Sequence, residues 1–331
     1  MASISIVLPN YNHAIELVTS LDAIAAQTRP PDEIVLVEDG STDNSIIVID
    51  SYRQRLPNLR VLRNSERLGV ALAVGRGIEA SKNDWILMAS ADEKLASDAC
   101  ATLAKTADRF PDAKLIVSEF TEWRPADGTI RVHGHETDSG MWYTDGSTPA
   151  FISPEKFGRL ARHRFILLAA NTALIRREAL IEVGGFDPKL KWHSDWFALY
   201  AIAFRFGFCA VPKPLAWFRV SSESYSGKGM QDPKSQRQVA LEIQRKLISP
   251  EFRDIDIAIM KAPIVMSTFF RATICVMAAR PLWYGRLSRL GMWWIREFLT
   301  GRRPAAWSRL LERAGLRSLA VKPLDQSDKL G

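Results

Sequence analysis

Short apolar runs alternate with segments of helical period along the first hundred residues of the chain. Residues 3–8 and 33–37 are rich in Ile and Val, as expected of parallel strands that are buried on both faces. Residues 43–56 and 70–80 have helical periodicity, and residues 60–62 and 85–89 are further strand candidates. The apolar positions between the first two strands are also at helical spacing, namely Leu17, Val18, Leu21, Ile24 and Ala25. This alternation predicts an α/β fold with a mainly parallel sheet flanked by helices.

The pattern changes after residue 118. Residues 119–153 are irregular and contain several glycines, which predicts a long loop, and so long a loop in a compact domain is usually functional. Residues 170–175 then predict a strand, residues 177–183 a helix, and residues 195–206 a helix with Ser194 as its N-cap. From about residue 231 the chain has a helical period, which predicts a separate helical region at its C-terminal end.

Polar residues follow three of the predicted strands directly. The clusters are residues 10–12 (Asn-Tyr-Asn), 38–41 (Glu-Asp-Gly-Ser) and 90–93 (Ser-Ala-Asp-Glu). Open α/β sheets bind ligands at the carboxyl ends of their parallel strands. We therefore expect the three clusters to converge on one crevice.

Composition indicates an intracellular globular protein. The chain has 331 residues, enough for one large domain with an appendage or for two modest domains. Its three cysteines form no CxxC pair, and residues 1–9 resemble a strand rather than a signal peptide. The most apolar stretch, residues 255–279, is interrupted by Lys261, Pro263 and Arg271, so we predict no transmembrane helix. A cytoplasmic location follows as an expectation.

The net charge of +7 is concentrated near the C-terminus. Residues 281–317 contain eight arginines and two glutamates, interleaved with Trp283, Trp293, Trp294 and Trp307. Arginine and tryptophan at helical spacing suit peripheral contact with an anionic membrane, where a lipid-linked acceptor would reside. The alternative is a helical subdomain that packs its tryptophans on the rest of the protein. No nucleic-acid-binding motif accompanies the basic stretch.

Three acidic residues suit different steps in moving a sugar from a nucleoside diphosphate to a hydroxyl group. Asp39 could accept hydrogen bonds from a base or ribose, and Asp92 could bind a divalent metal that neutralises a diphosphate. Asp195, in the first turn of a helix, could accept the acceptor's proton, and the helix N-terminus should lower its pKa. Spacing alone leaves open that Asp39 and Asp195 merely cap helices.

The ordered combination of these segments resembles the family 2 glycosyltransferases of the GT-A fold. Residues 5–12 are similar to their opening strand and loop, and residues 33–43 to their nucleotide-binding segment. Residues 64–78 and 85–93 resemble the next helix and the DXD strand, while residues 184–187 and 194–196 resemble the region of the catalytic base. The resemblance covers residues 3–226. It implies a Rossmann-like, mixed but mainly parallel sheet with a C-terminal helical extension.

The resemblance also implies a division of the chain and a set of roles. Residues 1–230 would form the catalytic domain, with a nucleotide-binding half at 1–105 and an acceptor-binding half at 106–230, while residues 231–331 form the extension. The reaction would be inverting transfer of a single sugar from a UDP-sugar or another nucleotide sugar, with Mg²⁺ or Mn²⁺, to a glycan or lipid-linked acceptor in cell-surface glycan or lipopolysaccharide assembly. Asp195 would be the general base and Asp92 the metal ligand. The donor nucleotide would contact Pro9, Tyr11, Glu38, Asp39 and Ser41.

The chain departs from the family pattern around the metal and the diphosphate. Ser90 replaces the usual first aspartate of the DXD motif, and Ser221 lies near the usual position of a histidine. Val74 and Gly75 occupy positions often held by Arg and Asn. The site would therefore have fewer metal and diphosphate ligands than is usual in the family. The residues that could assist there are Ser90, Glu93, Arg67, Arg76 and Arg219.

Other classes of protein fit the sequence less well. A nicotinamide dehydrogenase needs a Gly-x-Gly-x-x-Gly turn after the first strand, where this chain has Pro9-Asn-Tyr-Asn-His13. A nucleotidyltransferase usually has a Gly-rich loop at the same place. The remaining alternative is a non-catalytic protein that binds a nucleotide sugar or glycan with a degenerate metal site.

Overall fold

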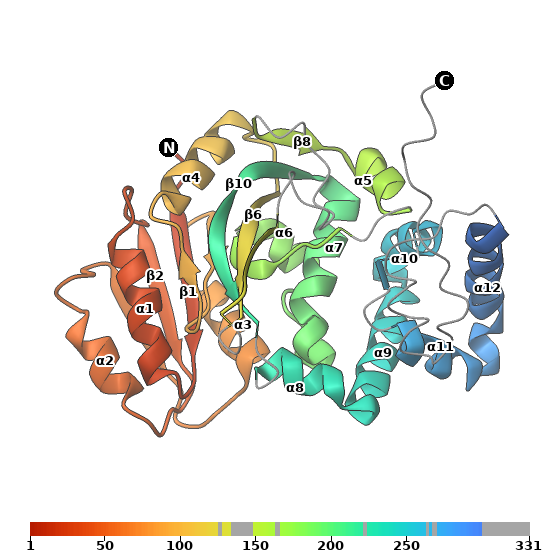
Figure 1. The fold of residues 1–331 in the computed structure, drawn as a ribbon, viewed down its shortest axis with the longest axis horizontal. Helices are drawn as coiled ribbons and strands as arrows, with labels where there is room; N and C mark the ends of the chain where they lie inside the picture. The colour runs from red at the N-terminus through yellow and green to blue at the C-terminus, as the bar shows by residue number, and fades with distance from the viewer. Residues whose placement is uncertain are drawn as a thin grey trace.

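The fold is an α/β sheet covered by helices, followed by a bundle of C-terminal helices (Figure 1). The computed structural model describes residues 1–124, 128–133, 148–162, 166–220, 224–262, 265–266 and 270–299. The N-terminal elements alternate as predicted: β1 (Ile4–Asn10), α1 (Ala14–Ala25), β2 (Glu33–Glu38), α2 (Ser45–Ser51), β3 (Leu59–Arg63), α3 (Val70–Ala80) and β4 (Trp85–Met88).

The middle of the chain completes the sheet. Its elements are β5 (Lys94–Leu95), α4 (Ala99–Arg109), β6 (Leu115–Trp123), β7 (Ile130–His133), β8 (Ala150–Ile152), α5 (Pro154–Leu160), η1 (Ala170–Thr172), β9 (Ala173–Arg176), α6 (Arg177–Glu182), η2 (Pro188–His193), α7 (Ser194–Phe206) and β10 (Phe208–Arg219). The strand order is β3-β2-β1-β4-β9-β6-β10-β5, with β7 beside β6 and β8 beside β10. β1 to β4 are parallel to one another, whereas β9 is antiparallel to β4 and β6. The predicted mixed, mainly parallel α/β sheet is confirmed.

Strand β1 shows why the sheet is covered on both faces. Its alternate residues Ile4, Ile6 and Leu8 pack in one hydrophobic cluster with α1 and α4, while Val7 belongs to a second cluster with α3 and α7. Side chains alternate between the faces of a strand, so a continuous apolar run requires a layer of helices on each side. This arrangement leaves the carboxyl ends of β1, β2 and β4 as the polar edge.

The C-terminal helices share a hydrophobic core with helix α7 of the α/β part of the chain. They are α8 (Tyr225–Gln231), α9 (Pro233–Leu247), η3 (Pro250–Phe252), α10 (Arg253–Lys261), α11 (Phe270–Ala278), η5 (Pro281–Trp283) and α12 (Tyr284–Leu299). Ile243 of α9 and Ile255 of α10 belong to the same cluster as Phe197 of α7. These helices lie at the end of the molecule opposite α2 (Figure 1). A division of the chain at residue 230 stays a prediction.

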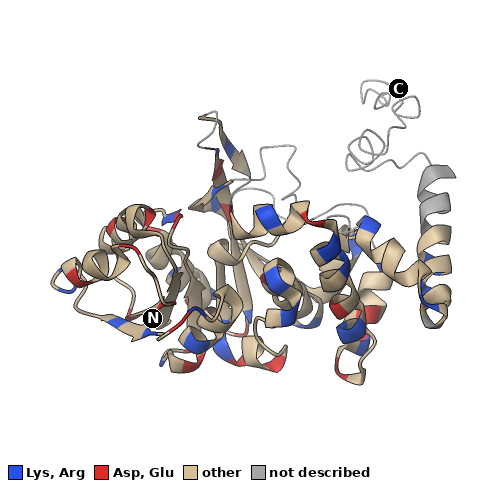
Figure 2. Ribbon diagram, turned by 90° about the horizontal axis from the view of Figure 1, so that it is seen from below, with Lys and Arg blue, Asp and Glu red and all other residues tan. Residues whose placement is uncertain are grey.

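Two residues of the basic, Trp-rich segment face inward rather than outward. Trp283 is only 4% exposed and packs with Val276 and Leu290. Arg286 is 6% exposed, and its guanidinium donates to Asp256 at 2.5 Å and to Gln244 at 3.1 Å. Basic and acidic residues are interspersed on the C-terminal helices (Figure 2). These two residues pack among the C-terminal helices, Trp307 and Arg302 to Arg317 lie outside the described residues, and membrane contact of the basic segment stays a prediction.

Several predicted boundaries are wrong. The helix predicted at residues 43–56 is shorter at both ends: it begins at Ser45, because Asp43 lies before it and accepts from the N–H groups of Ala14 and Ser45, and it ends at Ser51. The strand predicted at residues 170–175 begins as the short helix η1 and becomes β9 only from Ala173.

The predicted loop at residues 119–153 is partly strand. β6 extends into it, β7 pairs with β6, and β8 pairs with β10. The rest of that segment, residues 125–127 and 134–147, lies outside the described residues. None of the helices in the described ranges has both the length and the apolar character required to cross a membrane.

Candidate active site

The loops after β1 and β2 are joined by side-chain hydrogen bonds. Glu38, 1% exposed, accepts from the Asn10 side chain at 2.6 Å and from the backbone N–H of Ser41 at 2.6 Å. The Ser41 hydroxyl in turn accepts from the backbone N–H of Asn12 at 2.9 Å. Pro9 lies beside Val37 in the β1–β2 ladder. Pro9, Glu38 and Ser41 are therefore brought together at the predicted polar edge.

Asp39 holds the loop that leads into α3. Its carboxylate accepts from the Asn64 side chain at 2.7 Å and from the backbone N–H groups of Leu68 and Gly69 at 2.9 and 2.8 Å. Gly40 permits this contact, because it has a φ of +73° and a Cβ there would lie 2.9 Å from the Arg67 backbone nitrogen. Asp39 thus does not cap the helix that follows it in sequence, α2.

An aromatic and cationic cluster lies beside these loops. The Arg67 guanidinium lies 4.2 Å from the centre of the Tyr11 ring, which is within range of a cation–π interaction. The positive charge of Arg67 also lowers the pKa of Tyr225 at the start of α8, although burial raises that pKa by more. Tyr225 packs edge-on against Trp192, with ring centres 5.9 Å apart. Arg67 therefore contacts Tyr11 in the loop after β1 and acts electrostatically on Tyr225 of α8.

The acidic loop after β4 contains Asp92 and Glu93. The Ser90 hydroxyl donates to Asp92 at 2.5 Å, and the Asn171 side chain donates to Glu93 at 2.7 Å. Burial raises the pKa of Glu93 well above its ordinary value, and the negative charges of Asp92 and Asp195 raise it further. The hydrogen bond from Asn171 and the backbone of Arg219 act in the opposite direction. Asp195, although distant in sequence, is one of the charges that raise the pKa of Glu93.

Asp195 lies in the first turn of α7, and its carboxylate accepts from the backbone N–H of Trp196 at 2.8 Å. We expected the helix N-terminus to lower its pKa, and this expectation is wrong. Burial raises the pKa of Asp195 and outweighs the N–H contacts that lower it. The predicted N-cap is also wrong, because η2 runs directly into α7 and Ser194 already has helical backbone angles, which leaves His193 at the cap position.

The three arginines predicted to assist at the diphosphate, Arg67, Arg76 and Arg219, contact different partners. Arg76 donates to Asn64, the residue that bonds Asp39, and Arg219 donates to Glu16 at 2.9 Å. Both are thus engaged with protein side chains, whereas the contact described for Arg67 is with the Tyr11 ring. Ser221 lies outside the described residues.

The described acidic residues do not form a metal cage. Across the described ranges, no three His, Cys, Asp or Glu side chains are placed to hold a metal ion together. Asp92 and the Ser90 hydroxyl nevertheless offer hard oxygen donors, and Mg²⁺ is often bound by one or two carboxylates with substrate phosphates and water. The oxygens of Asp92 and Ser90 therefore suit a metal ion that is also bound by the diphosphate of the nucleotide sugar.

Sequence reasoning missed Asn64 and Asn171. Asn64 follows β3 at the same sheet edge as the three polar clusters, so the edge rule could have found it. Asn171 approaches Glu93 from η1, 78 residues further along the chain. No local pattern signals that contact.

A sheet of this topology, with Asp39 directly after β2 and Asp92 after β4 at the carboxyl ends of parallel strands, is typical of the GT-A glycosyltransferase fold. The family model described as "Glycosyl transferase family 2" matches residues 5–184. The chain belongs to glycosyl transferase family 2, and it is a glycosyltransferase.

Similar proteins agree with this assignment. "Glycosyltransferase GlyG" of Streptococcus pneumoniae serotype 4 is 32% identical over 232 residues, covering 58% of this chain and 76% of GlyG. The structure of S. aureus TarS in complex with UDP-GlcNAc has a TM-score of 0.59 at 16% identity, over 87% of this chain and 88% of that one. The mannosyltransferase PcManGT of Pyrobaculum calidifontis, in complex with GDP-Man and Mn²⁺, has a TM-score of 0.53 at 18% identity, over 95% and 85%. The two structural likenesses concern the fold.

Proposed function

We propose that this glycosyltransferase transfers a single sugar, with inversion, from a nucleoside-diphosphate sugar to an acceptor hydroxyl group. The observation that carries the proposal is that the charge of Asp195 raises the pKa of Glu93, the residue next to Asp92. A single displacement requires a general base near the site that binds the metal and the diphosphate, because the acceptor hydroxyl must lose its proton as its oxygen attacks the sugar. The raised pKa of Asp195 makes it a stronger base than an exposed aspartate.

The donor nucleotide would lie over the loops after β1 and β2. We assign Pro9 and Tyr11 to the base, with Glu38, Asp39 and Ser41 shaping the pocket around base and ribose. Because Arg67 lies on the Tyr11 ring, a base that stacks on Tyr11 has to displace it. The displaced guanidinium is then available for the diphosphate, the role that the family assigns to the arginine replaced here by Val74.

Asp92 would hold the metal, with Ser90 fixing one of its oxygens. When bound, Mg²⁺ or Mn²⁺ supplies positive charge that stabilises the leaving diphosphate. Glu93 accepts a hydrogen bond from Asn171, so we assign it to shaping the loop around Asp92 rather than to binding the metal. The acceptor half of the site, residues 106–230, would present a glycan or lipid-linked acceptor of cell-surface glycan or lipopolysaccharide assembly.

A screen of nucleotide sugars by melting temperature distinguishes an active glycosyltransferase from a non-catalytic protein that only binds the donor. We expect one nucleotide sugar among UDP-GlcNAc, GDP-mannose and related donors to raise the melting temperature only with Mn²⁺, because the metal links Asp92 to the diphosphate. At a donor concentration about 100 times the Kd, the stabilisation should be about 2.7 kcal/mol. The same donor should release its nucleoside diphosphate. Binding without any turnover of any donor would favour the non-catalytic alternative.

Membrane contact through the basic C-terminal region is a separate proposal. Trp283 and Arg286 are buried, so the contact would rest on the other arginines of residues 281–317. Basic residues near an anionic surface contribute about 1 kcal/mol each. We expect the full chain to sediment with phosphatidylserine vesicles at low salt and to dissociate at high salt. Protein that stays in the supernatant at low salt would contradict the proposal.

A further inference from the structure

The segment from Asp187 to His193, which contains the short helix η2, leads directly into α7, the helix with Asp195 in its first turn. Helices α8 and α9 pack against η2. Lys191 in this segment has a φ of 49°, a backbone conformation that costs a residue with a side chain about 1–2 kcal/mol. Such strain persists only where the surrounding structure holds it in place.

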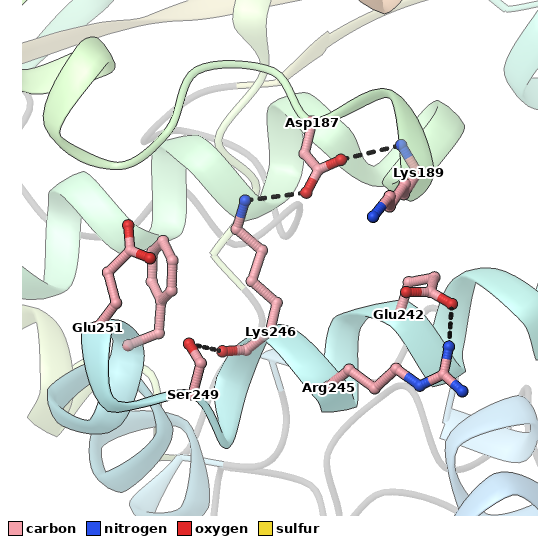
Figure 3. Close-up of a pocket in the computed structure, with 8 residues that line it drawn as sticks. Asp187, Lys189, Glu242, Arg245, Lys246, Ser249 and Glu251 are labelled. Carbon is pink, nitrogen blue, oxygen red and sulfur yellow. Dashed lines mark hydrogen bonds and ion pairs between the residues drawn. The ribbon is translucent and has the colours of Figure 1, made fainter.

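The first contact that holds the segment is an ion pair between Asp187 and Lys246 of α9 (Figure 3). The Lys246 Nζ lies 3.0 Å from one oxygen of Asp187, while the other oxygen accepts from the backbone N–H of Lys189 at 3.0 Å. The Lys246 side chain is only 16% exposed, and its ammonium lies 5.2 and 5.1 Å from the ring centres of Phe197 and Phe252. This partly buried pair forms part of the wall of a 430 Å³ pocket.

The second contact is a buried hydrogen bond between His193 and Gln236 of α9. The His193 Nε2 lies 3.3 Å from the Gln236 Oε1. Burial lowers the pKa of His193 to about 4, so the imidazole is neutral at neutral pH and its Nε2–H donates to the amide oxygen. His193 is two residues before Asp195, so this bond fixes the start of α7 directly.

The third contact fixes Trp192. Gly229 of α8 packs so closely on the indole ring that a Cβ at this position would lie 2.2 Å from it. Tyr225 of α8 contacts the same ring from another direction. Three residues of the segment from Asp187 to His193 therefore each contact a C-terminal helix: Asp187 and His193 bind α9, and Trp192 packs on α8.

We propose that α8 and α9 position the catalytic base, with Lys246 and Gln236 as positioning residues that hold the segment from Asp187 to His193 in the conformation that places Asp195 at the acidic loop. The inference rests on the proposed role of Asp195. It gives the C-terminal region a part in transfer that is independent of any membrane contact.

The test compares Lys246→Met with a matched ion pair at the other end of α7. Arg205, near the C-terminal end of this helix, pairs with Asp254 of α10 at 2.8 Å, so Asp254→Asn removes a comparable link without touching the base. A displacement of about 1 Å at a reacting group costs about 10²-fold in rate. We expect Lys246→Met to lower kcat for hydrolysis of UDP-GlcNAc or GDP-mannose by about 10- to 100-fold with an unchanged donor KM. Asp254→Asn should keep the wild-type kcat, and Lys246→Arg should restore most of it.

Two further variants keep the test decisive. If Lys246→Met does not fold, Gln236→Ala is measured in its place, with the same expected split between kcat and KM. Asp195→Asn in the same assay tests the base itself, so that wild-type hydrolysis by this variant would overturn the role of Asp195 and the inference with it. An inactive Asp195→Asn together with a wild-type kcat for folded Lys246→Met and Gln236→Ala would overturn the positioning role alone.

Discussion

Asp195→Asn is expected to abolish sugar transfer while leaving donor binding intact. An amide of the same shape keeps the carbonyl oxygen that accepts from the Trp196 N–H, but it cannot take the acceptor's proton. Loss of a general base costs about 10²- to 10⁴-fold in rate. The measurement is kcat for release of the nucleoside diphosphate, with the donor-induced rise in melting temperature as the control. Turnover within about threefold of wild type would exclude Asp195 as the base.

The same substitution should stabilise the fold at neutral pH, which a residue that merely caps a helix would not do. The folded-state pKa of Asp195 is raised, so the folded protein binds its proton more tightly than the unfolded chain does. Above the folded pKa the aspartate is ionised in both states, and the folded state carries the cost of a buried charge. Asparagine removes that cost. The gain should vanish at acid pH, where both states are protonated.

Glu93→Gln offers a comparison for this stability effect. Glu93 has the more strongly raised pKa, because burial and the charges of Asp92 and Asp195 all disfavour its ionised form. Its glutamine can still accept from the Asn171 side chain. Urea unfolding at pH 7.5 should therefore show a larger gain for Glu93→Gln than for Asp195→Asn. A loss of stability in both variants would show that hydrogen bonding, not desolvation, dominates at these carboxyl groups.

The parallel half of the fold could be predicted from the sequence because its signals are local. Apolar runs such as residues 33–37 are long enough to specify buried strands, and the polar clusters fall at their ends by the geometry of the sheet. Helix ends were less predictable. Ser194 looks like an N-cap in sequence, but the short helix η2 before it sets its backbone angles.

The chemistry of the site depends on contacts that sequence spacing does not contain. Position in a helix predicted a lowered pKa for Asp195, whereas the packing of the surrounding protein raises it. Glu93 meets Asn171 and Asp187 meets Lys246 across 78 and 59 residues, and no periodicity links such pairs. Trp283 shows the same limit, since an amphipathic pattern indicates that a helix has an apolar face but not whether protein or lipid covers it.

Asp39→Asn is expected to have the largest effect on stability of any conservative change at the polar edge of the sheet. Asp39 is 2% exposed, and its carboxylate accepts three hydrogen bonds, from Asn64, Leu68 and Gly69. An amide offers one oxygen, and its NH₂ group would face at least one of these donors in a buried place. Hydrogen bonds to charged groups contribute about 1.5–3 kcal/mol each, so the free energy of unfolding should fall by about 3 kcal/mol.

Asp43→Asn is the matched control, because Asp43 also accepts from two backbone N–H groups but is exposed to solvent. Water can satisfy the groups left unpaired there, so we expect a loss of about 1 kcal/mol or less. Because Asp39 holds the loop that carries Arg67 over Tyr11, its substitution should also abolish the donor-induced rise in melting temperature, whereas Asp43→Asn should keep it. If the two variants lose the same stability and both still bind the donor, the Asp39 carboxylate has no special role in the loop or in donor binding. If Asp39→Asn loses much stability but still binds the donor, Asp39 only holds the loop, and the nucleotide base is bound by Tyr11 without it.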